Sequence, residues 1–221
     1  MQRPIRILLA DDHAIVRAGY RHLLERQTGL EVIAEADNVQ DAYRLYRELQ
    51  PDIFITDISM PGASGLDAIR RILTVAPEAC ILVFSMHVSP DFAQAALQAG
   101  AKGYITKSSS PDVLLRAIPE TLAGRRILSP DIAKILAMAR MSGKKTPLAE
   151  LTPREFDLLR MLITSGDIEQ IGAALHLSPK TIQNLHYQIK RKLGVSSDIE
   201  MTKLALSWGL GDEVNAGASA V

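Results

Sequence analysis

The chain has 221 residues, which is enough for one large domain or two small ones, each able to bury a core. Its 25 Lys and Arg residues balance its 25 Asp and Glu residues, so net charge points neither to nucleic acid nor to a membrane surface. The single Cys80 excludes a disulfide framework, and no apolar stretch approaches the roughly 18–20 residues that span a bilayer. We therefore expect a soluble, cytoplasmic protein without a membrane partner.

The first half of the chain alternates short apolar runs with segments of helical periodicity. Five apolar runs predict strands: Ile5–Ala10, 30–35, 53–57, 80–84 and 103–106. Five strands that alternate with five helices predict an α/β fold with a doubly wound parallel sheet. The fifth helix, which we expect Ser110 to cap with Pro111 in its first turn, contains Pro119. We expect this proline to kink the helix without ending it.

Polar side chains follow four of the predicted strands. Asp11 and Asp12 follow the first strand, Asp57 the third, Ser85 the fourth and Lys107 the fifth. Ligands of open α/β sheets bind at the carboxyl ends of the strands, so we expect these side chains to converge. Three carboxylates at one edge repel each other, and a hard divalent cation such as Mg²⁺ relieves that repulsion. The set indicates a site that handles phosphoryl groups.

The ordered set of two acids, a third acid, a hydroxyl and a lysine resembles the receiver domain of two-component response regulators. The resemblance covers residues 1–124 and implies a flavodoxin-like fold. It also implies that Asp57 accepts a phosphoryl group from a sensor histidine kinase as an acyl phosphate. By the same resemblance, Mg²⁺ is held by Asp12, Asp57 and the backbone carbonyl of Ser59, with Asp11 acting through water.

Three further roles are implied by the same resemblance. Lys107 would pair with the phosphoryl oxygens, and the Ser85 hydroxyl would reach toward them. Tyr104 would swing inward when Ser85 moves, although a half-buried aromatic on an edge strand explains this residue equally well. Helix capping is the simpler alternative for the acids and for Ser85, and a surface position is the simpler reading of His13.

Residues 125–149 have the composition of a helical connector. Ser129-Pro130-Asp131 predicts the start of a short helix, and the loop composition of residues 142–149 places the domain boundary there. We expect a second, all-α domain over residues 150–211. The small residues of 212–221 predict a disordered tail.

The second half shows short helical patterns without strands. Thr152, with a proline next and Glu155 three positions later, is typical of a capping box at a helix start. A short helix at Ile168–Leu175, a tight turn and a longer helix at Pro179–Leu193 suggest a helix-turn-helix. A last helix is expected at residues 198–210.

This half resembles the LuxR-type DNA-binding domain in the arrangement of the NarL/FixJ response regulators. The matching stretches are 151–155, Leu175, 177–182, Ile189, 192–195, Ala205 and 209–210. The resemblance implies that the third helix of this domain enters the major groove. The residues implied to face DNA are Lys180, Thr181, Asn184, His186, Gln188 and Lys192.

The side-chain chemistry of the third helix is consistent with that role. Phosphates suit its cations, and base edges suit its amides. The cations are Lys180, Lys190, Arg191 and Lys192, and the amides are Gln183, Asn184 and Gln188.

Several features depart from the LuxR-type pattern. The segment from Gly166 to Leu175 is one residue shorter than usual, Leu185 stands where a His is frequent, and Asp198 where a basic residue is frequent. From Leu151 onward the chain has seven Lys or Arg residues against eight Asp or Glu. A DNA-binding domain is usually more basic.

We expect a phosphorylation-gated transcription factor that dimerises through its last helix and binds double-stranded promoter DNA, with RNA polymerase as a further candidate partner. We expect no dedicated enzymatic domain. Two alternatives stay open: a phosphatase that uses Asp57 as its nucleophile, and an interaction module that no longer binds DNA.

Overall fold

The structure, a computed structural model, describes residues 3–60, 65–142, 147–164, 167–175, 177–208 and 210. It divides into two compact units, Met1–Gly143 and Lys144–Val221, and each is described by itself. Gly166, at which the shortened segment begins, and the predicted tail at 212–221 lie outside the described residues. The domain limits predicted at residues 124 and 149 stay predictions.

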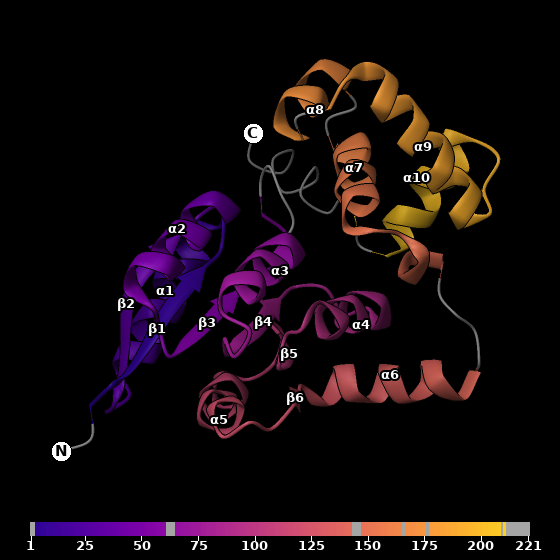
Figure 1. Cartoon of the computed structure of the whole chain (residues 1–221). Helices are drawn as coiled ribbons and strands as arrows, with labels where there is room; N and C mark the ends of the chain where they lie inside the picture. Colours follow the sequence, from indigo (N-terminus) through magenta and orange to yellow (C-terminus); the bar gives the residue numbers. More distant parts are fainter. Residues whose placement is uncertain are drawn as a thin grey trace, which may run out of the picture. The chain divides into compact units, whose positions relative to one another are not determined.

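A parallel sheet with the order β2-β1-β3-β4-β5-β6 forms the centre of the first unit (Figure 1). The predicted doubly wound fold is confirmed, but the expectation of five strands is corrected to six. The missed strand β6 has two residues, too few to show an alternating pattern in the sequence. The strands are β1 (Ile5–Ala10), β2 (Leu30–Ala36), β3 (Ile53–Thr56), β4 (Ile81–Ser85), β5 (Gly103–Thr106) and β6 (Ile127–Leu128).

Helices cover both faces of this sheet. Leu24 of α1 and Leu114 of α5 pack with the strands on one face, whereas α2, α3 and α4 contact each other in sequence over the other (Figure 1). The last helix, α6, contacts α4 and β5. The helices are α1 (Ala14–Glu25), α2 (Val39–Leu49), α3 (Gly65–Val75), α4 (Pro90–Ala99), α5 (Pro111–Leu122) and α6 (Pro130–Ser142).

The predicted start of α5 is only partly correct. Pro111 occupies the first turn, but the Ser110 side chain makes no capping hydrogen bond, which corrects the prediction that it caps the helix. The helix runs through Pro119 to Leu122, so this proline does not end it. Elsewhere Asn38 caps α2 and Ser89 caps α4 through side-chain oxygens that accept backbone N–H groups.

The second unit consists of short helices. The predicted capping box is confirmed, because Thr152 N donates to Glu155 Oε2 at 2.7 Å and Glu155 N to Thr152 Oγ1 at 3.3 Å. Among the described residues of both units, no helix combines the length and apolar character needed to cross a membrane. The elements are η1 (Pro147–Glu150), α7 (Pro153–Thr164), α8 (Ile168–Leu175), α9 (Pro179–Leu193) and α10 (Asp198–Ser207).

Asp91 is a buried acid at the start of α4. Asp91 is only 3% exposed, and its Oδ1 has no hydrogen-bond partner among the described residues. Burial raises the pKa of this carboxyl to about 6, against about 3.9 in an unfolded chain. The folded chain therefore binds a proton in this window that the unfolded chain has lost, so stability falls as pH rises through it.

We expect Asp91→Asn to remove this penalty. The free energy of unfolding of the variant minus that of wild type should rise by about 2–3 kcal/mol between about pH 4 and pH 8, as measured by urea denaturation. The matched control is Asp112→Asn, which changes an exposed acid in the same position of α5. A difference for Asp91→Asn that stays constant with pH would contradict the prediction.

Candidate functional site

The carboxyl ends of four strands carry the polar side chains that the sequence singled out. β1, β3, β4 and β5 are neighbours in the sheet and run parallel, so their ends lie at one edge (Figure 1). The order in which the chain adds strands changes direction between β1 and β3, because β2 lies on one side of this pair and β4 on the other. Ligands of doubly wound folds bind at this switch point.

Lys107 lies between two carboxylates at this edge. Its Nζ is 2.5 Å from Asp57 Oδ2 and 2.6 Å from Asp11 Oδ2, and the three side chains are 3–4% exposed. Burial opposes a charged ammonium, but the two carboxylates outweigh burial and hold the pKa of Lys107 above its ordinary value. Three of the residues that the sequence predicted therefore form one buried cluster.

Backbone groups orient the Asp57 carboxylate. Ile58 N donates to Asp57 Oδ1 at 2.6 Å, and Ser59 N lies 3.3 Å from the same oxygen. The start of α3 lies directly against this segment, because a Cβ added at Gly65 would overlap the Asp57 carbonyl oxygen. Asp57 thus has one oxygen held by the backbone and the other by Lys107.

A second acidic group lies next to this cluster. Ligand atoms of Asp11, Asp12 and His13 lie within 4.8 Å of one another, and His13 Nδ1 is 2.9 Å from Asp12 Oδ1. Oxygen ligands of this kind fit a hard divalent cation such as Mg²⁺. The described geometry joins Asp57 to this group through Lys107, and the ligand set of Asp11, Asp12, Asp57 and Ser59 stays a prediction.

Ser85 and Tyr104 are both fully buried beside this edge. The Tyr104 hydroxyl donates to the His87 carbonyl at 2.9 Å, and burial raises the pKa of Tyr104 above its ordinary value. His87 in turn links the segment after β4 to the segment after β3, because its Nε2 is 2.6 Å from Ser59 Oγ. The His87 ring also stacks on Phe92. The alternative of a half-buried Tyr104 is therefore wrong.

The second unit places α8 and α9 as the two helices of the predicted helix-turn-helix. Ser178 caps α9 by accepting from Thr181 N, and Gly194 ends it with a left-handed backbone. Ile182, Ile189 and Leu193 bury one face of α9 in the unit's core. The opposite face is consequently free of the core.

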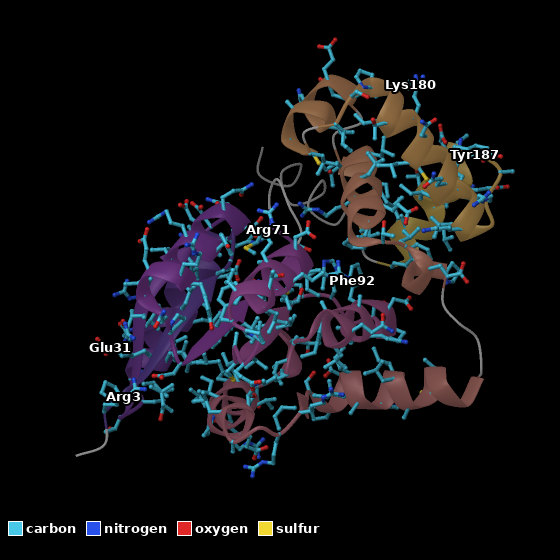
Figure 2. The ribbon with its side chains drawn as sticks, in the orientation of Figure 1. Arg3, Glu31, Arg71, Phe92, Lys180 and Tyr187 are labelled. Carbon is cyan, nitrogen blue, oxygen red and sulfur yellow. The ribbon has the colours of Figure 1, made fainter. Side chains whose placement is uncertain are left out.

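Most of the predicted DNA-facing residues lie on that exposed face of α9. Lys180 and Tyr187 both project from this helix in Figure 2. Tyr187 is 67% exposed and was not singled out in the sequence. The predicted residues that are exposed are Lys180, Thr181, Gln183, Asn184, Gln188 and Arg191.

The other three predicted DNA-facing residues are only partly exposed, and each lies close to an acid. Lys192 Nζ is 2.6 Å from Glu155 Oε2, whose residue is 2% exposed. Lys190 Nζ and His186 Nε2 each lie 2.9 Å from Asp198 Oδ1, and Lys190 is the larger cause of the lowered pKa of Asp198. These acids compensate part of the positive charge that the helix offers to DNA.

Comparison with known proteins agrees with this division of the chain. Residues 7–119 match the response regulator receiver domain, and residues 149–205 match the bacterial regulatory proteins of the luxR family. The chain belongs to the response-regulator family. It is a response regulator with a receiver domain followed by a LuxR-type DNA-binding domain.

Curated relatives match over almost the whole response regulator. The regulator UvrY of Escherichia coli K12 is 36% identical over 208 residues, which are 93% of this chain and 95% of the relative. The regulator GacA of Pseudomonas aeruginosa is 36% identical over 210 residues, 94% of this chain and 98% of the relative.

Solved structures of response regulators are also similar to this one. A LuxR-family regulator from Aurantimonas is 51% identical, with a TM-score of 0.61, over 62% of this chain and 99% of that chain. RcsB of Salmonella typhimurium is 26% identical with a TM-score of 0.75, over 93% of this chain and 98% of that chain.

Sequence reasoning missed four residues of the response regulator that the structure brings into its sites. They are Gly65, His87, Tyr187 and Thr106, the last being the fully buried residue directly before Lys107. His87 and Thr106 each lie within two positions of a predicted site residue, so proximity in the sequence was a usable signal. Tyr187 could have been found as a large aromatic on the polar face of an amphipathic helix.

Proposed function

We propose that Asp57 is the phosphoacceptor of this response regulator and that its phosphorylation gates DNA binding. The observation that carries the proposal is the Asp57 carboxylate, buried at the end of β3 and held between the Ile58 N–H and the Lys107 ammonium. A carboxylate in this setting is oriented for attack and has a cation beside it for the incoming oxygens.

Each neighbouring group has a part in the proposed transfer. An Asp57 oxygen bonds to phosphorus as the bond from phosphorus to the kinase histidine nitrogen breaks, which leaves an acyl phosphate and a free imidazole. Lys107 pairs with the phosphoryl oxygens, and the buried Ser85 hydroxyl donates to one of them. Tyr104 follows the movement of Ser85.

Mg²⁺ is the proposed metal of this site. Asp11, Asp12, Asp57 and the Ser59 carbonyl would hold it, which fits the buried carboxylates at adjacent strand ends. When bound, Mg²⁺ would neutralise negative charge on the oxygens of the transferred group.

The exposed face of α9 is the proposed DNA-reading surface. Gln183, Asn184 and Gln188 suit base edges, and Lys180 and Arg191 suit phosphates. Lys190, Lys192, Thr181 and His186 stay in the proposed set, although ion pairs hold three of them. The related RcsB has been solved bound to promoter rprA in the presence of phosphomimetic BeF3-, and as two RcsB dimers bound to two parallel DNAs.

The proposed partners follow from this scheme. A sensor histidine kinase supplies the phosphoryl group, and a second copy of the chain forms a dimer with the first on DNA. RNA polymerase is the further proposed partner. These partners and the single buried thiol of Cys80 support a cytoplasmic location. An interaction module without DNA binding is a second candidate, because three cations or potential cations of α9 are compensated by acids.

The acceptor is tested by intact mass spectrometry after incubation with Mg²⁺ and acetyl phosphate. Wild type is expected to gain one phosphoryl group, and Asp57→Ala none. The matched control is Asp52→Ala, which removes a partly exposed acid that precedes the same strand, and it should gain the group like wild type. A phosphoryl group on Asp57→Ala would show that another residue is the acceptor.

A further inference from the structure

Three helices of the receiver domain begin with the same three residues, Ser-Pro-Asp. Their aspartates are Asp91 in α4, Asp112 in α5 and Asp131 in α6. Asp91 is buried, Asp112 is exposed, and Asp131 reaches the central sheet. The shared local sequence supports a helix start in all three, so the contact of Asp131 with β5 needs a separate explanation.

Asp131 contacts the residue at the end of β5. Thr106 Oγ1 donates to Asp131 Oδ2 at 2.7 Å, and Thr106 is fully buried. Burial would raise the pKa of Asp131, but hydrogen bonds from Ser129, Thr106 and the Ile132 backbone outweigh burial and hold that pKa below its ordinary value. The ionised carboxylate is therefore the form that fits this contact.

Ser129 adds a second connection between the same elements. Its N–H donates to the Tyr104 carbonyl at 3.0 Å, and its Oγ accepts from Thr106 N at 3.3 Å. Ser129 is fully buried. We call Thr106, Ser129 and Asp131 the Thr106 cluster; it joins β5 to the start of α6 by three hydrogen bonds.

The helix that follows is packed onto the receiver domain. Ile132 is fully buried and Leu136 is 8% exposed, and α6 contacts α4 and β5 (Figure 1). β6 approaches β5 so closely that a Cβ added at Gly103 would lie 2.8 Å from the Ile127 carbonyl oxygen. β5 and α6 are therefore joined by packed groups and not by a loose loop.

The opposite side of the same short strand faces the proposed acceptor. Lys107 follows Thr106 directly, its N–H donates to the Ser85 carbonyl at 2.8 Å, and its Nζ pairs with Asp57. The Tyr104 hydroxyl donates to the His87 carbonyl. Lys107 and Thr106 share a planar peptide bond, so a backbone movement at Lys107 also displaces Thr106.

We propose that the Thr106 cluster couples the phosphorylation state of Asp57 to α6, the helix that leads into the DNA-binding domain. The inference rests on the proposed function, because it takes Asp57 as the acceptor. Phosphorylation adds about two negative charges beside Lys107. The Lys107–Thr106 segment shifts toward them, and the hydrogen bonds of Thr106 to Ser129 and Asp131 rearrange with it.

The test measures hydrogen exchange of α6 amides in the full chain with Mg²⁺, with and without beryllofluoride as the phosphoryl stand-in. Wild type should change its exchange rate in α6 by about fivefold or more, the range of typical coupling between sites. Asp131→Ala should bind beryllofluoride, seen by fluorine NMR, but lose this response. Asp112→Ala, the matched acid of α5, should keep it.

Thr106→Val removes the hydroxyl with little change of shape and should also lose the response. A full response in Asp131→Ala and Thr106→Val, with beryllofluoride bound, overturns the coupling alone. Bound beryllofluoride without any α6 response in wild type does the same. Wild type that binds no beryllofluoride overturns the acceptor assignment and the coupling with it.

Discussion

Lys107→Met is expected to lower the free energy of unfolding of the receiver domain by about 3–5 kcal/mol. The methionine keeps apolar volume but leaves two buried carboxylates, Asp57 and Asp11, without the ammonium that lies 2.5 Å and 2.6 Å from them. Urea denaturation followed by circular dichroism measures the loss. Trp208 is the only tryptophan, so its fluorescence reports the DNA-binding domain separately.

The sign of the pH dependence follows from the raised pKa of Lys107. The ammonium contributes its full stabilisation below the ordinary lysine pKa of about 10.4, and that contribution is lost only as pH rises through the higher folded value. The deficit of Lys107→Met should therefore be constant between about pH 7 and pH 9. Added Mg²⁺ should reduce it, because a divalent cation can neutralise the same carboxylates.

Lys102→Met is the matched control for this variant. Lys102 precedes β5 as Lys107 follows it, and its Nζ donates to the Glu78 carbonyl in an exposed position. We expect its effect to stay within about 0.5 kcal/mol. Equal losses of unfolding free energy in the two variants would show that Lys107 stabilises the fold no more than an exposed lysine does.

The strand-end cluster could be predicted because the geometry of a parallel sheet determines it. Once five apolar runs are read as parallel strands, the residues that follow them meet at one edge. That argument needs no knowledge of side-chain packing. It therefore located Asp11, Asp57, Ser85 and Lys107 correctly at one edge, while the division of metal ligands among the acids depends on distances that a sequence does not contain.

The contacts of the connector could not be predicted in the same way. Ile127–Leu128 is too short to show strand periodicity, and Asp131 looks like an ordinary first-turn acid in α6. Its partner Thr106 lies 25 positions earlier. Long-range polar pairs of this kind depend on tertiary packing, and three identical Ser-Pro-Asp starts acquire three different environments.

The helical periodicity of α9 already indicated that Lys192 does not lie at the centre of the exposed face. Ile189 and Leu193 are buried, so position 192 flanks the buried stripe of α9 and not the centre of its exposed face. The acid that pairs with it was recognised in the sequence only as part of a capping box. Glu155 serves both roles, since Thr152 N and Lys192 Nζ both donate to its Oε2.

Lys192→Met is consequently expected to lower the free energy of unfolding of the DNA-binding domain by about 3 kcal/mol, because it leaves Glu155 as a buried carboxylate without its cation. Burial alone would raise the pKa of Glu155, but hydrogen bonds from Lys192 and Thr152 outweigh burial and hold it below its ordinary value. The stabilisation by ionised Glu155 is fully present above the ordinary glutamate pKa. It is lost as pH falls through the lower pKa that Glu155 has in the folded chain. Trp208 fluorescence during urea denaturation measures it.

Lys180→Met supplies the contrast on the same helix. Lys180 is exposed at the start of α9 (Figure 2), so its loss should change stability by less than about 0.5 kcal/mol. If it contacts a phosphate, the slope of log K against log salt for duplex DNA should become shallower by about 0.9. Unchanged stability in Lys192→Met together with a shallower slope would contradict the stabilising role, and would show that Lys192 binds a phosphate rather than holding Glu155.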